Sequence, residues 1–112
     1  MTTYEFWDQI INMEISKAEA SSDEELEIYR MNLWALVYAI AQDKASGMRR
    51  VLAESTLFDI LTTYVAAGVI TMDEAMTNRP HDVELPKELS AEVEAHLLLL
   101  TSLNNPETFA EA

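Results

Sequence analysis

Catalysis by proton transfer would most simply start from the two histidines of this chain, His81 and His96. Asp82 follows His81 in a segment opened by Pro80, and a neighbouring carboxylate can orient an imidazole as a general base. One adjacent dipeptide is a weak signal, so we expect a solvated loop there. His96 falls on an apolar stripe, which predicts a hydrogen-bonded histidine of the core or of an interface. No nucleophile, phosphate-loop or zinc-protease motif accompanies them, so we expect a protein that is not an enzyme.

Metal chemistry would need a denser set of ligands than the sequence offers. Glu92 and His96 lie one helical turn apart, but a di-iron bundle needs Glu-x-x-His pairs on facing helices. The acids of residues 23–27 lack the glycine and the ligand spacing of a calcium loop. Cysteine is absent, which removes thiolate sites. We therefore expect no metal and no cofactor.

Carboxylates are the group that the chain carries in excess. Its 112 residues hold 20 acidic and 7 basic side chains, for a formal charge of −13, although 49% of the residues are apolar. Unbalanced charge opposes compaction, and a soluble domain normally mixes both signs. The surplus predicts attraction to a basic protein surface, such as that of a protein that handles nucleic acid. The candidate partner-binding residues are two acidic clusters and two leucines outside the main stripe of the last helix: Asp23, Glu24, Glu25, Glu27, Glu88, Glu92, Glu94, Leu98 and Leu99.

Two functions follow as hypotheses. The first is an acidic protein that binds and blocks a basic, nucleic-acid-handling partner, in the manner of a phage-type inhibitor or DNA mimic of the anti-restriction or anti-CRISPR class. Leu98, Leu99 and Trp7 are candidates for its apolar anchor. The alternative is a helical assembly factor or chaperone that holds one cognate partner in an apolar groove. A two-fold homodimer through the first or the last helix is compatible with both.

Location and surroundings are expectations of the same kind. The longest strongly apolar run, residues 33–41, is too short for a bilayer-spanning helix, and the first residues lack the pattern of a signal peptide. We expect a cytoplasmic protein that binds neither membranes nor nucleic acid directly, because both are anionic.

These side chains must be positioned by helices, because glycine and proline are scarce and helix formers abound. Apolar spacing predicts a compact, single-domain, all-α bundle of five to six helices over residues 1–103, followed by a frayed polar tail, residues 104–112. The expected helices cover residues 3–20, 23–45 and 48–67, the last as two helices or as one bent at residues 55–56. A short helix follows from a Thr71–Glu74 capping box, then a loop over residues 78–85 and a last helix over residues 86–103.

Two single residues carry further expectations. Glu14 falls in the middle of the apolar face of the first helix, where an unpaired carboxylate is costly. Either Arg30, Arg49 or Arg50 pairs with it, or that part of the face is exposed. Gly47 is expected to be the left-handed residue that ends the second helix.

Overall fold

The computed structural model describes residues 1–19 and 22–103, and within them it is an all-α bundle without strands. The predicted fold class is confirmed; the predicted tail, residues 104–112, lies outside the described residues. In chain order the elements are α1 (Thr3–Lys17), α2 (Asp23–Ala41), α3 (Gly47–Ala66), α4 (Met72–Thr77), the short 3-10 helix η1 (Pro80–Asp82) and α5 (Lys87–Leu103). No helix in this part of the chain combines the length and apolarity needed to cross a bilayer.

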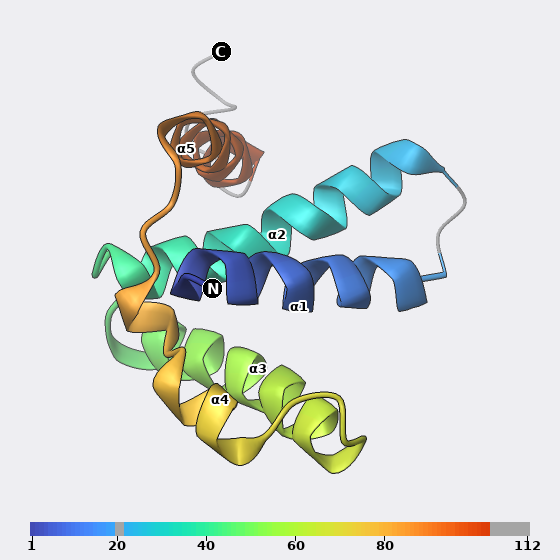
Figure 1. Cartoon of the computed structure of the whole chain (residues 1–112). Helices are drawn as coiled ribbons and strands as arrows, with labels where there is room; N and C mark the ends of the chain where they lie inside the picture. Colours follow the sequence, from blue (N-terminus) through green and yellow to red (C-terminus); the bar gives the residue numbers. More distant parts are fainter. Residues whose placement is uncertain (20–21, 104–112) are drawn as a thin grey trace.

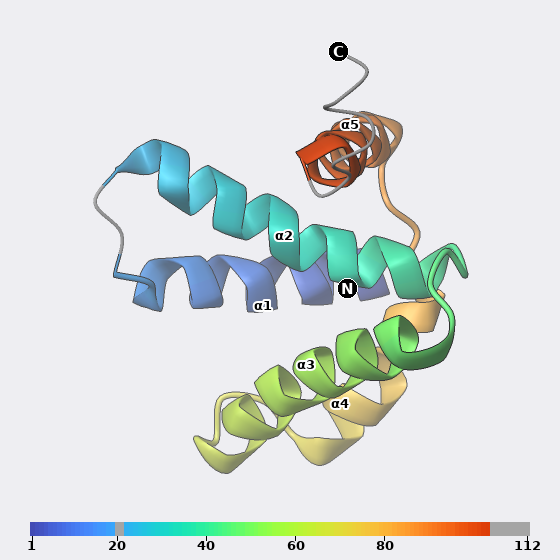
Figure 2. The ribbon, with the colours of Figure 1, turned by 180° about the vertical axis from the view of Figure 1, so that it is seen from behind.

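Helix α2 is the centre of the bundle, as its apolar composition predicts. It contacts α1, α3, α5 and η1. Trp34 and Val37 of α2 are fully buried, together with Trp7 and Ile10 of α1. Figures 1 and 2 show the α1–α2 pair in the middle, with α5 on one side and α3 and α4 on the opposite side. Helix α5 is therefore separated from α3 and α4 by the α1–α2 pair.

The end of α2 differs from the expectation. The helix stops at Ala41 because Asp43, with φ of 54°, takes the left-handed position. The amide of Lys44 donates to the carbonyl of Ala39 at 2.8 Å, and that of Asp43 donates to Ile40 at 3.2 Å. These are the two bonds of a Schellman motif. Gly47 is left-handed as expected (φ 58°), but it stands at the start of α3 instead of the end of α2.

Residues 47–66 form one continuous helix, so the alternative of two separate helices is wrong. The apolar residues of this helix lie on different faces in its first and later turns, without a break in the helix. One face of α3 packs in the core through Ala53, Leu57, Leu61 and Tyr64, whereas the apolar residues of its first turns, Met48, Val51 and Leu52, are exposed. At its other end, Gly68 (φ 75°) ends the helix in a second Schellman motif.

Helix α4 begins where the sequence places it. The amide of Glu74 donates to Thr71 Oγ1 at 3.0 Å, and the amide of Thr71 donates to Glu74 Oε1 at 2.9 Å, so the predicted capping box is present. The helix has six residues and no buried side chain, and it packs on α3. Its far end is tied to the core by Trp7, whose indole Nε1 donates to the carbonyl of Asn78 at 2.8 Å.

Candidate functional site

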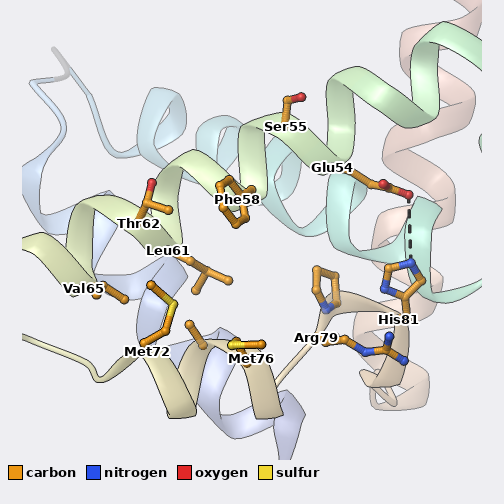
Figure 3. A pocket seen from close by; sticks show the side chains of 12 residues that line it. Glu54, Ser55, Phe58, Leu61, Thr62, Val65, Met72, Met76, Arg79 and His81 are labelled. Carbon is orange, nitrogen blue, oxygen red and sulfur yellow. Dashed lines mark ion pairs between the residues drawn. The ribbon is translucent and has the colours of Figure 1, made fainter.

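An open apolar groove of about 480 Å³ lies between α3 and α4. Its walls come from successive turns of the two helices: Phe58, Leu61 and Val65 on α3, and Met72, Ala75 and Met76 on α4. Figure 3 shows the side chains of Met72 and Met76 facing those of Phe58 and Leu61 across the groove. Phe58 is 64% exposed and Met76 is 69% exposed, so apolar surface is presented to solvent here.

The groove exists because α3 has two apolar faces and α4 is too short to cover the second one. Leu57 and Tyr64 are buried in the core, while Phe58, one residue after Leu57, is exposed. Met72 and Met76 are one helical turn apart, so both point from α4 to the same side. Unbranched methionine side chains adapt to irregular partners, which is why such surfaces are common at binding grooves.

One end of the groove is polar. His81 Nε2 lies 3.9 Å from Glu54 Oε1 (Figure 3). This carboxylate also accepts a hydrogen bond from Arg50 Nε at 2.8 Å. Arg79 Nε lies 3.5 Å from Asp82 Oδ2. The sequence pair His81–Asp82 is therefore split, because the imidazole faces Glu54 and the carboxylate faces Arg79. Within the described residues, no group of three or more His, Asp or Glu side chains is arranged to hold a metal ion.

The two predicted acidic clusters meet at one arginine. Arg30 donates to Glu27 at 2.9 and 3.1 Å, and the same guanidinium lies 3.8 Å from Glu92. The hydrogen bonds from Arg30 hold the pKa of Glu27 below its usual range. Glu94 plays a structural part, because it accepts a hydrogen bond from the Tyr38 hydroxyl and so fastens α5 to α2. That hydrogen bond, together with burial, raises the pKa of Tyr38.

The remaining acidic candidates are exposed but do not gather on one surface with the groove. Asp23, Glu24 and Glu25 lie in the first turn of α2, where they also match the helix dipole, and Glu88 lies in the first turn of α5. Acidic residues occur on every described helix, and four of the basic residues pair with them: Lys17, Arg30, Arg50 and Arg79. The negative charge is thus distributed over all the described helices.

The apolar candidates have different outcomes. Leu98 and Leu99 are exposed on α5, on the far side of the bundle from the groove. Trp7 is fully buried, so the prediction that it contacts a partner is wrong. His96 Nε2 lies 2.7 Å from Asn32 Oδ1 at the junction of α5 with α2, which confirms that the histidine is hydrogen-bonded, although it is half-buried and not part of the core.

Glu14 has partners that the sequence did not suggest. Its carboxylate accepts hydrogen bonds from the hydroxyls of Tyr64, at 2.7 Å, and Tyr29, at 3.3 Å, and lies 3.2 Å from Lys17 Nζ. The ammonium of Lys17 also sits 4.4 Å from the centre of the Tyr64 ring. The prediction of an arginine partner is therefore wrong. This cluster joins α1, α2 and α3, and so fixes the helix that bears the groove.

The groove itself was missed at the sequence level. Its signal was present as Phe58 outside the core stripe of α3 and as the pair Met72 and Met76 in a short helix. Comparisons with protein-family models, with curated proteins and with solved structures find no match to this chain. The choice of site therefore depends on the chemistry of the chain's own residues.

Proposed function

We propose that this protein is a non-enzymatic interaction protein that holds a segment of one cognate protein partner in the groove between α3 and α4, as an assembly factor or chaperone does. The observation that carries the proposal is the convergence of three exposed side chains, Phe58, Met72 and Met76, on one open groove. Exposed apolar surface of this kind marks sites where proteins or ligands bind, and a hydrophobic groove is a common docking place for a peptide segment.

The energetics favour a protein segment as the ligand. Burial of a fully exposed large apolar side chain contributes about 1.5–3 kcal/mol, so Phe58 and Met76, at 64% and 69% exposure, would each contribute about 1–2 kcal/mol when covered. Two or three such anchors, with matching apolar residues on the partner, are typical of the few side chains that dominate binding energy at protein interfaces.

The test compares two serine variants that remove similar exposed apolar side chains. Phe58→Ser alters the groove, and Leu98→Ser alters α5, where the leucine is 70% exposed. Neither side chain is part of the buried core, so both variants should fold. We expect affinity capture from host lysate to lose one specific protein with Phe58→Ser and to retain it with Leu98→Ser. A partner that is kept by Phe58→Ser and lost by Leu98→Ser would refute the proposal.

A second function is favoured by a separate observation, the meeting of Glu27 and Glu92 beside Arg30. It is the binding and blocking of a basic, nucleic-acid-handling protein, with carboxylates taking the place of phosphates. Such binding would weaken steeply between about 0.1 M and 0.5 M salt, because screening shortens the reach of surface charges.

Charge reversal separates the two functions. A Glu24→Lys, Glu25→Lys, Glu27→Lys triple variant should abolish binding to a partner that recognises this cluster. Glu84→Lys, between η1 and α5 and outside the groove, tests whether one reversed charge at another exposed acidic site has any general effect. Unchanged binding by the triple variant, with capture still lost in Phe58→Ser, would refute the second function and leave the first.

A further inference from the structure

We infer that the segment held in the groove is a basic amphipathic α-helix of about three turns. This inference rests on the proposed function of the groove and adds the chemistry of its occupant. The groove-lining residues of α3 run from Glu54 to Val65. At a rise of about 1.5 Å per residue they span about 16 Å, which is the length of three helical turns.

A helix suits the groove better than an extended strand. The part of the chain that the structure describes has no β-strand, and therefore no sheet edge whose amide and carbonyl groups could pair with an extended peptide. Apart from Thr62, whose hydroxyl donates to the carbonyl of Asp59, the lining from Leu61 to Met72 is apolar, so an occupant must satisfy most of its backbone hydrogen bonds itself. An α-helix does so, and its apolar residues at positions i, i+3 or i+4, and i+7 would follow Phe58, Leu61 and Val65.

The charge of the molecule selects a basic helix. The formal charge is −13, and two exposed acids flank the groove. Asp59 lies one turn from Ser55 and from Thr62 on α3, and Asp73 follows Met72 on α4. The basic residues near the polar end already face carboxylates, Arg79 facing Asp82 and Arg50 facing Asp43 and Glu54. An occupant with lysine or arginine beside its apolar stripe would therefore be attracted over a long range.

The other occupants of a groove fit less well. A second copy of this chain carries the same charge of −13 and would be repelled. The chain's own α5 lies on the opposite side of the α1–α2 pair (Figures 1 and 2), so its exposed leucines do not reach the groove.

The test uses synthetic peptides of about 15 residues, long enough to form a helix when bound. The first peptide has leucines at positions i, i+3, i+4 and i+7 and lysines elsewhere. Its acidic twin has glutamate in place of lysine, and a third peptide is a scramble of the first without the stripe. Binding is followed by NMR of isotope-labelled methionine methyl groups in the full chain. The six methionines report on different places, because Met72 and Met76 line the groove, whereas Met31 is buried in the core.

We expect the basic peptide to shift the signals of Met72 and Met76 and to leave that of Met31 in place. Its affinity should exceed that of the acidic twin and of the scramble by at least about tenfold at low salt. Phe58→Ser should weaken it by about tenfold, whereas Leu98→Ser should leave it unchanged.

The outcomes separate this inference from the proposed function. Equal binding of the basic and acidic peptides at Met72 and Met76 would overturn the basic occupant and leave groove binding intact. Shifts only at other methionines, or no binding of the basic peptide while Phe58→Ser still abolishes capture of the natural partner, would overturn the helical occupant alone. If the basic peptide does not bind at Met72 and Met76, and Phe58→Ser also leaves capture of the natural partner unchanged, the proposed function is refuted as well.

Discussion

Replacement of Tyr64 by phenylalanine tests whether the Glu14 cluster fixes the groove-bearing helix. The Tyr64 hydroxyl donates to Glu14 at 2.7 Å, and the Glu14 side chain is 16% exposed. Hydrogen bonds to charged groups contribute about 1.5–3 kcal/mol, and the carboxylate keeps Lys17 and Tyr29 in the variant. We therefore expect Tyr64→Phe to lower the free energy of unfolding by about 2 kcal/mol.

Thermal unfolding would show this loss clearly. A chain of 112 residues has an unfolding entropy of about 0.24 kcal/mol/K, so a loss of about 2 kcal/mol lowers Tm by about 8 °C. Tyr29→Phe is the matched control, because its hydroxyl lies farther from the same carboxylate, at 3.3 Å, and its loss should cost under about 1 kcal/mol.

A double-mutant cycle measures the coupling between Tyr64 and Glu14. It compares the urea unfolding of the wild type, Tyr64→Phe, Glu14→Gln and the variant that carries both substitutions. The cycle should give a coupling energy of about 1 kcal/mol or more between Tyr64 and Glu14. The reasoning is refuted if Tyr64→Phe costs no more than Tyr29→Phe, or if the cycle shows no coupling.

Three further predictions concern other parts of the fold. Trp7→Phe should cost at least about 1 kcal/mol more than Trp34→Phe in urea unfolding. Both side chains are fully buried, but the Trp7 indole donates to Asn78, while Trp34 Nε1 finds no hydrogen-bond partner among the described residues; equal costs would contradict this. Stability should fall above about pH 10 as tyrosinate absorbance appears, because the pKa values of Tyr38 and Tyr64 are raised in the folded state. The two tyrosines therefore contribute fully to stability below the pKa of the unfolded chain, and this contribution is lost as pH rises through the pKa of the folded state. Tyrosinate that appears well below pH 10 in the folded protein would contradict this prediction. Asp43→Gly should raise Tm by a few degrees in a thermal scan, because glycine takes the left-handed position without the strain of a side chain; a lower Tm would show that the exposed contact with Arg50 matters more.

Local signals in the sequence predicted the fold well. The Thr71–Glu74 capping box, the left-handed Gly68 and the apolar centre of α2 each depend on neighbouring residues, so their consequences can be deduced without the tertiary structure. The end of α2 could not be deduced in this way, because an aspartate at position 43 competes with Gly47 for the left-handed position. Asparagine and aspartate tolerate that conformation, so spacing alone does not choose between them.

The site was predicted less completely, because it depends on contacts between distant residues. The two tyrosine partners of Glu14 come from 15 and 50 positions away, and no local pattern indicates a tyrosine rather than an arginine, whereas Lys17 lies only three positions away. The groove requires α4 to fold back beside α3, which makes Phe58 and Met76 neighbours although they belong to different helices. Trp7 was a candidate anchor because the apolar face of the first helix is wide. Only the packing of α2 on α1 shows that the part of this face with Trp7 is buried.

Site-specific photo-crosslinking tests the central claim most directly. A photoreactive residue would replace Met76 in the groove, Leu98 on α5 or Glu24 in the first acidic cluster, in three separate variants of the full chain. All three positions are exposed, so the probe does not disturb the core. We predict that the partner forms a covalent adduct with position 76 and forms little or none with positions 98 and 24. An adduct at position 98 or 24 without one at position 76 would contradict the assignment of the groove as the binding site.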